Sequence, residues 1–111
     1  MILITGANGL IGRALTALYL KSGQALRLHV RSKRALLAVF PDIATHADVE
    51  IVEQEFGQAK LDDMRKLVAG CHTVIHTAAL VHKPQVNAES YRLLNLEATE
   101  LLALAAKETG T

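Results

Sequence analysis

Apolar residues follow two alternating periods along the chain, so that short strand-like runs are separated by longer helix-like stripes. Runs rich in Ile, Leu and Val predict four strands, over residues 1–5, 25–30, 49–52 and 73–77. Apolar spacings of three and four predict helices between and after them, containing residues 11–18, 33–40, 61–68 and 94–105. Helix ends are indicated by Gly23, Pro41, Gly70 and Gly110.

The resulting order is βαβαβαβα, which predicts an α/β fold of three layers. We expect a Rossmann-type, doubly wound parallel sheet, partial and of about four strands, with helices on both faces. In such a sheet, ligands bind beyond the carboxyl ends of the strands. The segments to search for a site therefore begin at Thr5, Arg31, Gln54 and Thr77.

Length and composition limit the remaining choices. With 111 residues, half of them hydrophobic, the chain has room for one domain over residues 1–111 and is not a disordered tail. Cys71 is the only cysteine, which excludes an internal disulfide framework and fits a reducing compartment. Neither a secretory signal nor an apolar run of membrane-spanning length is visible, so we expect a cytoplasmic protein without a membrane partner.

Charge is distributed unevenly. Residues 1–41 contain six Lys and Arg residues and no acid, whereas all eleven acids and the other six bases follow. A cationic excess beside a glycine-rich turn favours a ligand that carries phosphate, and the alternative is a solvated basic face. Nucleic acid is not expected as a partner, because Phe40 is the only aromatic residue near the basic run.

The segment from Thr5 to Gly12, Thr-Gly-Ala-Asn-Gly-Leu-Ile-Gly, joins the first strand to the first helix. In a dinucleotide site, one glycine permits the tight turn, one lets the backbone approach the pyrophosphate, and one allows close helix–strand packing. The helix N-terminus then offers free N–H groups to the phosphates. This position in a βαβ unit makes the motif specific.

Three motifs in order resemble the extended branch of the short-chain dehydrogenase/reductase superfamily, the NAD(P)-dependent nucleotide-sugar epimerases and dehydratases. The first is Thr-Gly-x-x-Gly-x-x-Gly at the N-terminus, and the second is Val-Ile-His-Thr-Ala-Ala over 74–79. The third is Tyr-x-x-x-Asn-x-x-Ala-Thr over 91–99, in which Ala98 replaces the family's glycine. The resemblance covers all 111 residues.

The resemblance assigns cofactor-binding residues to all three motifs and to the third strand's end. Glu55 and Phe56 match an Asp-Leu pair that brackets adenine, although Glu replaces Asp and Gln54 replaces a usual glycine. Ala78 and Ala79 would lie along the nicotinamide. The remaining residues expected at the cofactor are Gly6, Asn8, Gly9, Leu10, Ile11, Gly12, Thr77 and Asn95.

The segment after the second strand bears on the choice of cofactor. A ribose 2′-hydroxyl requires an acid there, whereas the 2′-phosphate of NADP requires a base. The chain has Arg31, Ser32 and Arg34 and no acid in that segment, which favours NADP over NAD. In the alternative, Arg31 stacks on adenine and either cofactor binds.

The family's catalytic Tyr-x-x-x-Lys pair is missing, because Tyr19 is followed four residues later by Gly23 and Tyr91 by Asn95. The chain therefore resembles the N-terminal cofactor-binding part of an epimerase or dehydratase that acts by hydride transfer at a sugar hydroxyl, without catalytic and substrate-binding parts. A nucleotide sugar would be the substrate of the longer parent. Alternatives are a non-catalytic NADP-binding sensor and a reductase of sterol- or flavonoid-type substrates.

An exposed face of the last helix would allow a homodimer, as in the related epimerases.

Histidines and the cysteine suggest no metal site. His72 and His76 lie on one strand, roughly 13 Å apart, too far for one zinc ion. We interpret His76 as part of the strand motif, His72 as a surface residue and His82 as a loop residue. Cys71 is expected to pack as a small hydrophobic side chain.

Overall fold

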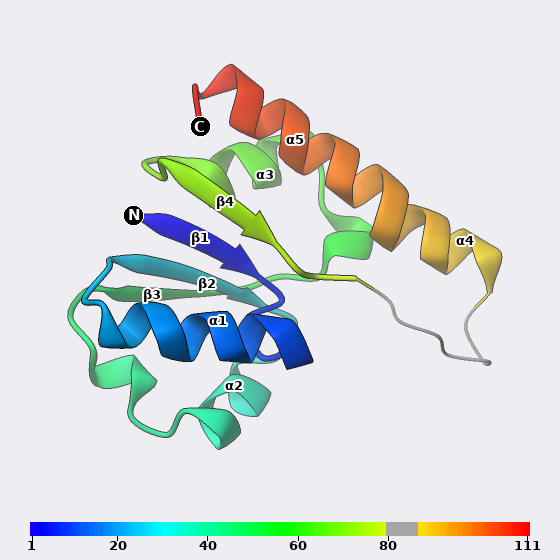
Figure 1. Cartoon of the computed structure of the whole chain (residues 1–111). Helices are drawn as coiled ribbons and strands as arrows, with labels where there is room; N and C mark the ends of the chain where they lie inside the picture. Colours follow the sequence, from blue (N-terminus) through cyan, green and yellow to red (C-terminus); the bar gives the residue numbers. More distant parts are fainter. Residues whose placement is uncertain (80–86) are drawn as a thin grey trace.

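A computed structural model describes residues 1–79 and 87–111. Its sheet contains four parallel strands in the order β3-β2-β1-β4 (Figure 1). The strands are β1 Ile2–Thr5, β2 Leu26–Val30, β3 Val49–Glu53 and β4 Thr73–His76. All four predicted strands are confirmed, with limits that differ by one residue at most.

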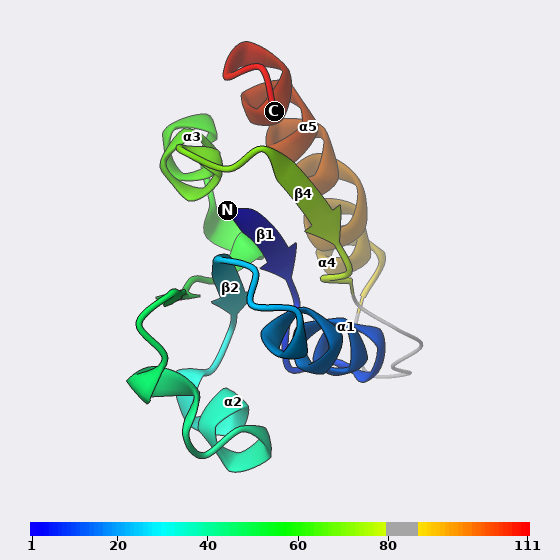
Figure 2. The same ribbon diagram turned by 60° about the vertical axis from the view of Figure 1, so that its left-hand side comes forward.

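Helices cover both faces of the sheet, as Figure 2 shows with α1 and α2 on one side and α3 and α5 on the other. The helices are α1 Leu10–Lys21, α2 Lys33–Val39, α3 Leu61–Val68, α4 Ala88–Tyr91 and α5 Ala98–Glu108. A π-helical segment, Arg92–Glu97, joins α4 to α5, and 3₁₀ turns occupy Ile43–Thr45 and Phe56–Gln58. The α/β Rossmann-like fold is thereby confirmed. The predicted loop through Pro84 and His82 lies outside the described residues.

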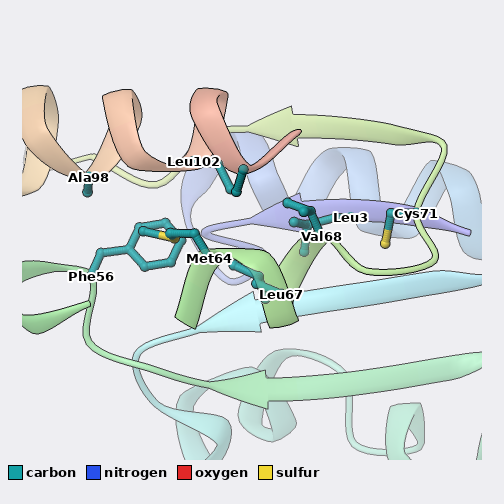
Figure 3. Close-up of a cluster of buried hydrophobic side chains, with 9 residues drawn as sticks. Leu3, Phe56, Met64, Leu67, Val68, Cys71, Ala98 and Leu102 are labelled. Carbon is teal, nitrogen blue, oxygen red and sulfur yellow. The ribbon is translucent and has the colours of Figure 1, made fainter. Parts of the chain in front are cut away.

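The central strand β1 divides the core into two clusters, because successive side chains of a strand point to opposite faces. Leu3 packs with Met64, Leu102 and other residues of the α3–α5 side, as Figure 3 shows. Ile2 and Ile4 pack on the other side with residues of β2 and α2. Cys71 belongs to the first cluster, which confirms its predicted packing.

The first helix differs from the prediction in the face that it buries. Its apolar stripe predicts a helix correctly, but Ile11 is 65 % exposed and Leu18 is 61 % exposed. Gly12 and Thr16 are the buried residues of α1 instead. The reason is the glycine turn, which brings the start of the helix so close to the sheet that Gly12 lies against it, while Leu15, Tyr19 and Leu20 pack on the second cluster.

Helix ends follow the sequence signals closely. Gly23, Gly70 and Gly110 each follow a helix with a positive φ, of 74°, 78° and 73°. Ser32 caps the start of α2, since its Oγ accepts a hydrogen bond from the Ala35 amide at 3.1 Å. In residues 1–79 and 87–111, no helix has both the length and the apolar character needed to cross a membrane.

Candidate functional site

The carboxyl ends of the four strands lie at one edge of the sheet, because all four run in the same direction (Figure 1). The chain leaves this edge through Gly6, Arg31, Gln54 and Thr77. Residues that are up to 73 positions apart in the sequence form hydrogen bonds there, as Thr5 and Ala78 show. The predicted site segments are thus brought together.

Gly6 begins the turn after β1 in a backbone conformation that favours glycine. Its φ is +65°, in the left-handed region. A Cβ at this position would also lie 2.8 Å from both the amide nitrogen and the Cα of Ala78. Gly6 therefore permits both the turn and its close contact with the segment after β4.

Gly12 and Gly9 meet different surroundings. A Cβ on Gly12 would lie 2.0 Å from the carbonyl oxygen of Gly6, so helix α1 can pack on the turn only with glycine here. A Cβ on Gly9 would meet one atom within 4 Å, the same Gly6 oxygen at 3.3 Å. That contact is tight, but Gly9 is exposed and meets no other atom, so the remaining space beside it is open to a ligand, whereas the other two positions are closed by the protein itself.

Helix α1 begins at this open position without a cap. Gly9 is its N-cap residue, no side chain accepts a hydrogen bond there, and the first turn contains no acid. The first amides of a helix have no intrahelical acceptor and carry a partial positive charge. Leu10 and Ile11 are exposed at 81 % and 65 %. This combination fits the pyrophosphate of a dinucleotide. Its negative oxygens can accept hydrogen bonds from the helix amides, and it needs the space that a side chain at residue 9 would fill.

A chain of hydrogen bonds fixes the segment after β4. Thr5 Oγ1 accepts hydrogen bonds from the Thr77 amide at 3.0 Å and the Ala78 amide at 3.1 Å. The Thr5 hydroxyl is then the donor to His76 Nδ1, at 2.6 Å. His76 Nε2 donates to Thr99 Oγ1 at 2.9 Å, because the Thr99 hydroxyl itself donates to the carbonyl of Asn95 at 2.8 Å.

Each hydrogen bond of this network has one consistent donor and acceptor. With Nδ1 as an acceptor and Nε2 as a donor, His76 must be neutral. Burial lowers the pKa of His76 and supports the neutral ring. Thr77 adds a hydrogen bond from its hydroxyl to the Thr5 carbonyl, at 2.5 Å. The network positions Thr77, Ala78 and Asn95 relative to the glycine turn, and Ala79 lies exposed at its end.

His29 lies between two segments of the candidate site, a contact that sequence reasoning missed. It is 1 % exposed, and its Nδ1 accepts a hydrogen bond from the Gly6 amide at 3.3 Å. Its Nε2 donates to the carbonyl of Gln54 at 3.0 Å. Burial lowers the pKa of His29 to about 4. The available signal was a histidine in a strand buried on both faces, where both ring nitrogens need partners.

The basic segment after β2 lies beside an acidic side chain from the neighbouring strand β3, a contact that the sequence did not predict. Arg31, Lys33 and Arg34 are exposed. Glu53 Oε2, on the neighbouring strand, accepts a hydrogen bond from the Lys33 amide at 2.7 Å, because Glu53 pairs with Val30 in the sheet. The segment itself lacks an acid, as the sequence indicates, but the sheet register places the carboxylate of Glu53 beside it.

The two residues after β3 have separate environments. Glu55 is exposed, and its Oε1 accepts a hydrogen bond from the Gly57 amide at 3.4 Å. Phe56 is 3 % exposed and stacks on the His29 ring with centroids 3.8 Å apart. Its side chain belongs to the core (Figure 3), so a ligand would meet Glu55 and the backbone here rather than an aromatic face.

The remaining predicted residues are Asn8, Asn95 and His72. Asn8 lies half-buried in the glycine turn, and Asn95 lies in the π-helical segment. His72 is exposed, as predicted. No cluster of three or more His, Cys, Asp or Glu side chains suited to a metal occurs among the described residues.

Solved structures of other proteins share this fold. The UDP-Glc/GlcNAc 4-epimerase of Campylobacter jejuni superposes with a TM-score of 0.82 at 21 % identity, over 98 % of this chain and 34 % of that one. A tyrosine-to-phenylalanine mutant of the UDP-glucuronic acid 4-epimerase of Bacillus cereus, in complex with UDP-4-deoxy-4-fluoro-glucuronic acid and NAD, gives a TM-score of 0.77 at 22 % identity, over 96 % and 36 %. Uronate dehydrogenase of Agrobacterium tumefaciens, in a complex with NAD, gives 0.73 at 20 % identity, over 98 % and 37 %.

The chain therefore spans a little more than a third of the length of these solved structures, and at such identities they show the fold alone. Among curated proteins, no sequence matches the chain. The model of the NAD dependent epimerase/dehydratase family matches residues 2–111. The chain belongs to the NAD-dependent epimerase/dehydratase family.

Proposed function

We propose that residues 1–111 are the N-terminal, dinucleotide-binding portion of a longer Rossmann-type enzyme. The observation that carries the proposal is the contrast within the glycine turn. Gly6 and Gly12 are closed by protein contacts, whereas Gly9 faces open space at the uncapped start of α1. A pyrophosphate is the ligand that such a turn fits best.

The dinucleotide would lie across the carboxyl edge of the sheet. Its pyrophosphate would bind the backbone of Gly9, Leu10 and Ile11, with Asn8 beside it. Its adenine would meet Glu55 and the backbone of Phe56. Its nicotinamide half would follow Thr77, Ala78 and Ala79 toward Asn95, where small side chains leave room for a ring.

The basic segment supports a preference for NADP. Arg31 and Arg34 are exposed, and among the described residues no carboxylate forms an ion pair with either guanidinium. A guanidinium can bind a 2′-phosphate through two parallel hydrogen bonds. The Ser32 hydroxyl already caps α2, so the arginines would carry the discrimination. NAD is the alternative, favoured by the carboxylate of Glu53 at the same turn.

The reaction proposed for the longer protein is hydride transfer at a hydroxyl of a nucleotide sugar, in a UDP-hexose 4-epimerase-like or dehydratase reaction. When bound, the dinucleotide supplies the hydride acceptor. The described residues bind and orient it, and they hold the Ala78–Ala79 segment in place through Thr5 and His76. The acid–base pair Tyr-x-x-x-Lys is not among these 111 residues.

The single buried cysteine is consistent with a reducing compartment, and we propose that the protein is cytoplasmic.

A second candidate is a dinucleotide-binding sensor of the same superfamily, which binds NADP without turnover. Absence of the Tyr-x-x-x-Lys pair from the parent sequence as a whole would favour it. A reductase of sterol- or flavonoid-type substrates would share the cofactor site as well. A Tyr-x-x-x-Lys pair in the parent sequence beyond Thr111 would support an enzyme over the sensor.

The direct test is calorimetric titration of the 111-residue protein with NAD, NADP and, as a control, a nucleotide without the second phosphate such as AMP. We expect saturable binding of one dinucleotide per chain, tighter than AMP, because the glycine turn recognises the pyrophosphate. A folded protein that binds neither NAD nor NADP would contradict the proposal.

A further inference from the structure

We propose that His29 is a positioning residue of the dinucleotide site. Its neutral imidazole holds the glycine turn at a fixed distance from the loop after β3, and this bridge sets the affinity for the dinucleotide. The inference rests on the proposed function and adds a residue that lies outside the three family motifs. His29 is in β2, three residues before the Ser32 cap of α2.

Both ring nitrogens of His29 are used, and each is used by a different part of the site. Nδ1 accepts the Gly6 amide at 3.3 Å, and Nε2 donates to the Gln54 carbonyl at 3.0 Å. Gly6 begins the turn that would bind pyrophosphate, and Gln54 precedes the Glu55 that would meet adenine. One side chain therefore connects the phosphate half of the site with its adenine half.

The ring has no freedom to change partners. It is 1 % exposed, and it is stacked on Phe56 with ring planes 16° apart. The backbone adds a parallel contact, because the carbonyl of His29 accepts a hydrogen bond from the Ala7 amide at 3.0 Å. The orientation of the Gly6 amide therefore depends on Nδ1 as an acceptor, and a doubly protonated ring would lose that acceptor.

Two polar variants separate the two contacts. In His29→Asn, the side-chain oxygen takes the place of Nδ1 and keeps an acceptor for the Gly6 amide. In His29→Gln, the longer side chain reaches the place of Nε2 and can keep a donor for the Gln54 carbonyl, with no acceptor near Gly6. The pair differs by one methylene, so each variant is the control for the other.

We expect His29→Gln to weaken dinucleotide binding by roughly tenfold, the equivalent of about one buried hydrogen bond. His29→Asn should retain affinity within about threefold. The measurement is calorimetric titration of the 111-residue protein with NAD and NADP, together with thermal unfolding of each variant. A merely structural histidine would make affinity follow the melting temperature in both variants, so equal losses in Asn and Gln would overturn the inference.

A second measurement does not depend on any variant. Nitrogen-15 spectra of the wild-type imidazole should show an unprotonated Nδ1 and a protonated Nε2 near neutral pH, with a coupling from Nδ1 to the Gly6 amide. The opposite tautomer would overturn the inference even if neither variant folded. A wild type that has the expected tautomer and binds neither dinucleotide would instead contradict the proposed function.

Discussion

The carbonyl oxygen of Gly6 lies 2.0 Å from the place that a Cβ on residue 12 would take. No side chain can be accommodated between them, because the neighbour is backbone at the turn and not the flexible end of a side chain. The first helix can therefore pack this closely on the turn after the first strand only because residue 12 has no Cβ. Two residues six positions apart thereby define the geometry on which the proposed phosphate contact depends.

Gly12→Ala should destabilise the fold. Overpacking against backbone costs about 1–3 kcal/mol, and the better helix propensity of Ala recovers up to about 1 kcal/mol of that. We expect the free energy of unfolding to fall by about 2 kcal/mol, measured by urea denaturation. Gly9→Ala is the matched control, since its Cβ meets one atom at 3.3 Å. Equal stability of the two variants would contradict the packing described for Gly12.

Gly9→Val should remove dinucleotide binding while leaving the protein folded. The branched side chain would occupy the open space beside the uncapped start of α1, where the pyrophosphate is proposed to bind. Calorimetric titration would measure the affinity, and circular dichroism would confirm the fold. If the folded variant bound dinucleotide as tightly as wild type, the phosphate site would have to lie elsewhere.

Arg31→Asp should weaken NADP binding and leave NAD binding equal or better. A charge-assisted hydrogen bond contributes about 1.5–3 kcal/mol, and exposure of Arg31 should keep the loss near tenfold. Lys21→Asp makes the same charge change at the far end of α1 and serves as the control. Titrations at two salt concentrations should show a stronger salt dependence for NADP than for NAD.

Glu53 offers a second test of the preference for NADP over NAD. Its carboxylate lies at the Lys33 amide, beside the proposed phosphate position, so Glu53→Gln should strengthen NADP binding relative to NAD. Wild type that prefers NAD at low salt would refute the role given to Arg31. It would favour an NAD-dependent epimerase.

Acid should destabilise the protein between about pH 6.5 and pH 4. The unfolded chain protonates His29 near its ordinary pKa of 6.5, whereas in the folded protein the pKa is lowered to about 4. The unfolded state therefore binds more protons across this range, and stability is lost as the pH falls, by roughly 3 kcal/mol at pH 4. His76, whose pKa burial also lowers, adds to the loss in the same direction.

Urea denaturation at several pH values would measure this slope. His29→Asn cannot titrate and should show a shallower dependence than wild type. Identical pH profiles of the two proteins would contradict the lowered pKa of His29, because they would mean that folding leaves this pKa unchanged.

The 111-residue protein should show no turnover of nucleotide sugars. Under the proposed function its residues position a dinucleotide, but they include no Tyr-x-x-x-Lys pair, and general acid–base groups contribute about 10²–10⁴-fold each. A coupled assay with UDP-hexoses and either cofactor would measure the rate. Robust turnover by the purified chain would contradict the assignment of catalysis to a further part of the protein.

Local patterns in the sequence determined the elements and their order. Ile and Leu runs specify the strands, glycines with positive φ end three helices, and the glycine turn follows the first strand. Parallel pairing then follows from the alternation of strands and helices, so the meeting of the candidate site's segments at the carboxyl edge could be predicted as well. These features depend on residues close together in the chain, which a one-dimensional pattern records.

Contacts between strands were decided only by the tertiary structure. The apolar stripe of α1 predicted the helix but not its buried face, because the contact of Gly12 with Gly6 sets the rotation of the helix against the sheet. Glu53 reaches the Lys33 amide through the register of β2 and β3, and Phe56 turns into the core to stack on His29. His29 meets Gly6 and Gln54, each more than 20 residues away, for the same reason. Which side chains meet at a sheet edge depends on strand register and helix rotation, and both are fixed by packing across the whole fold.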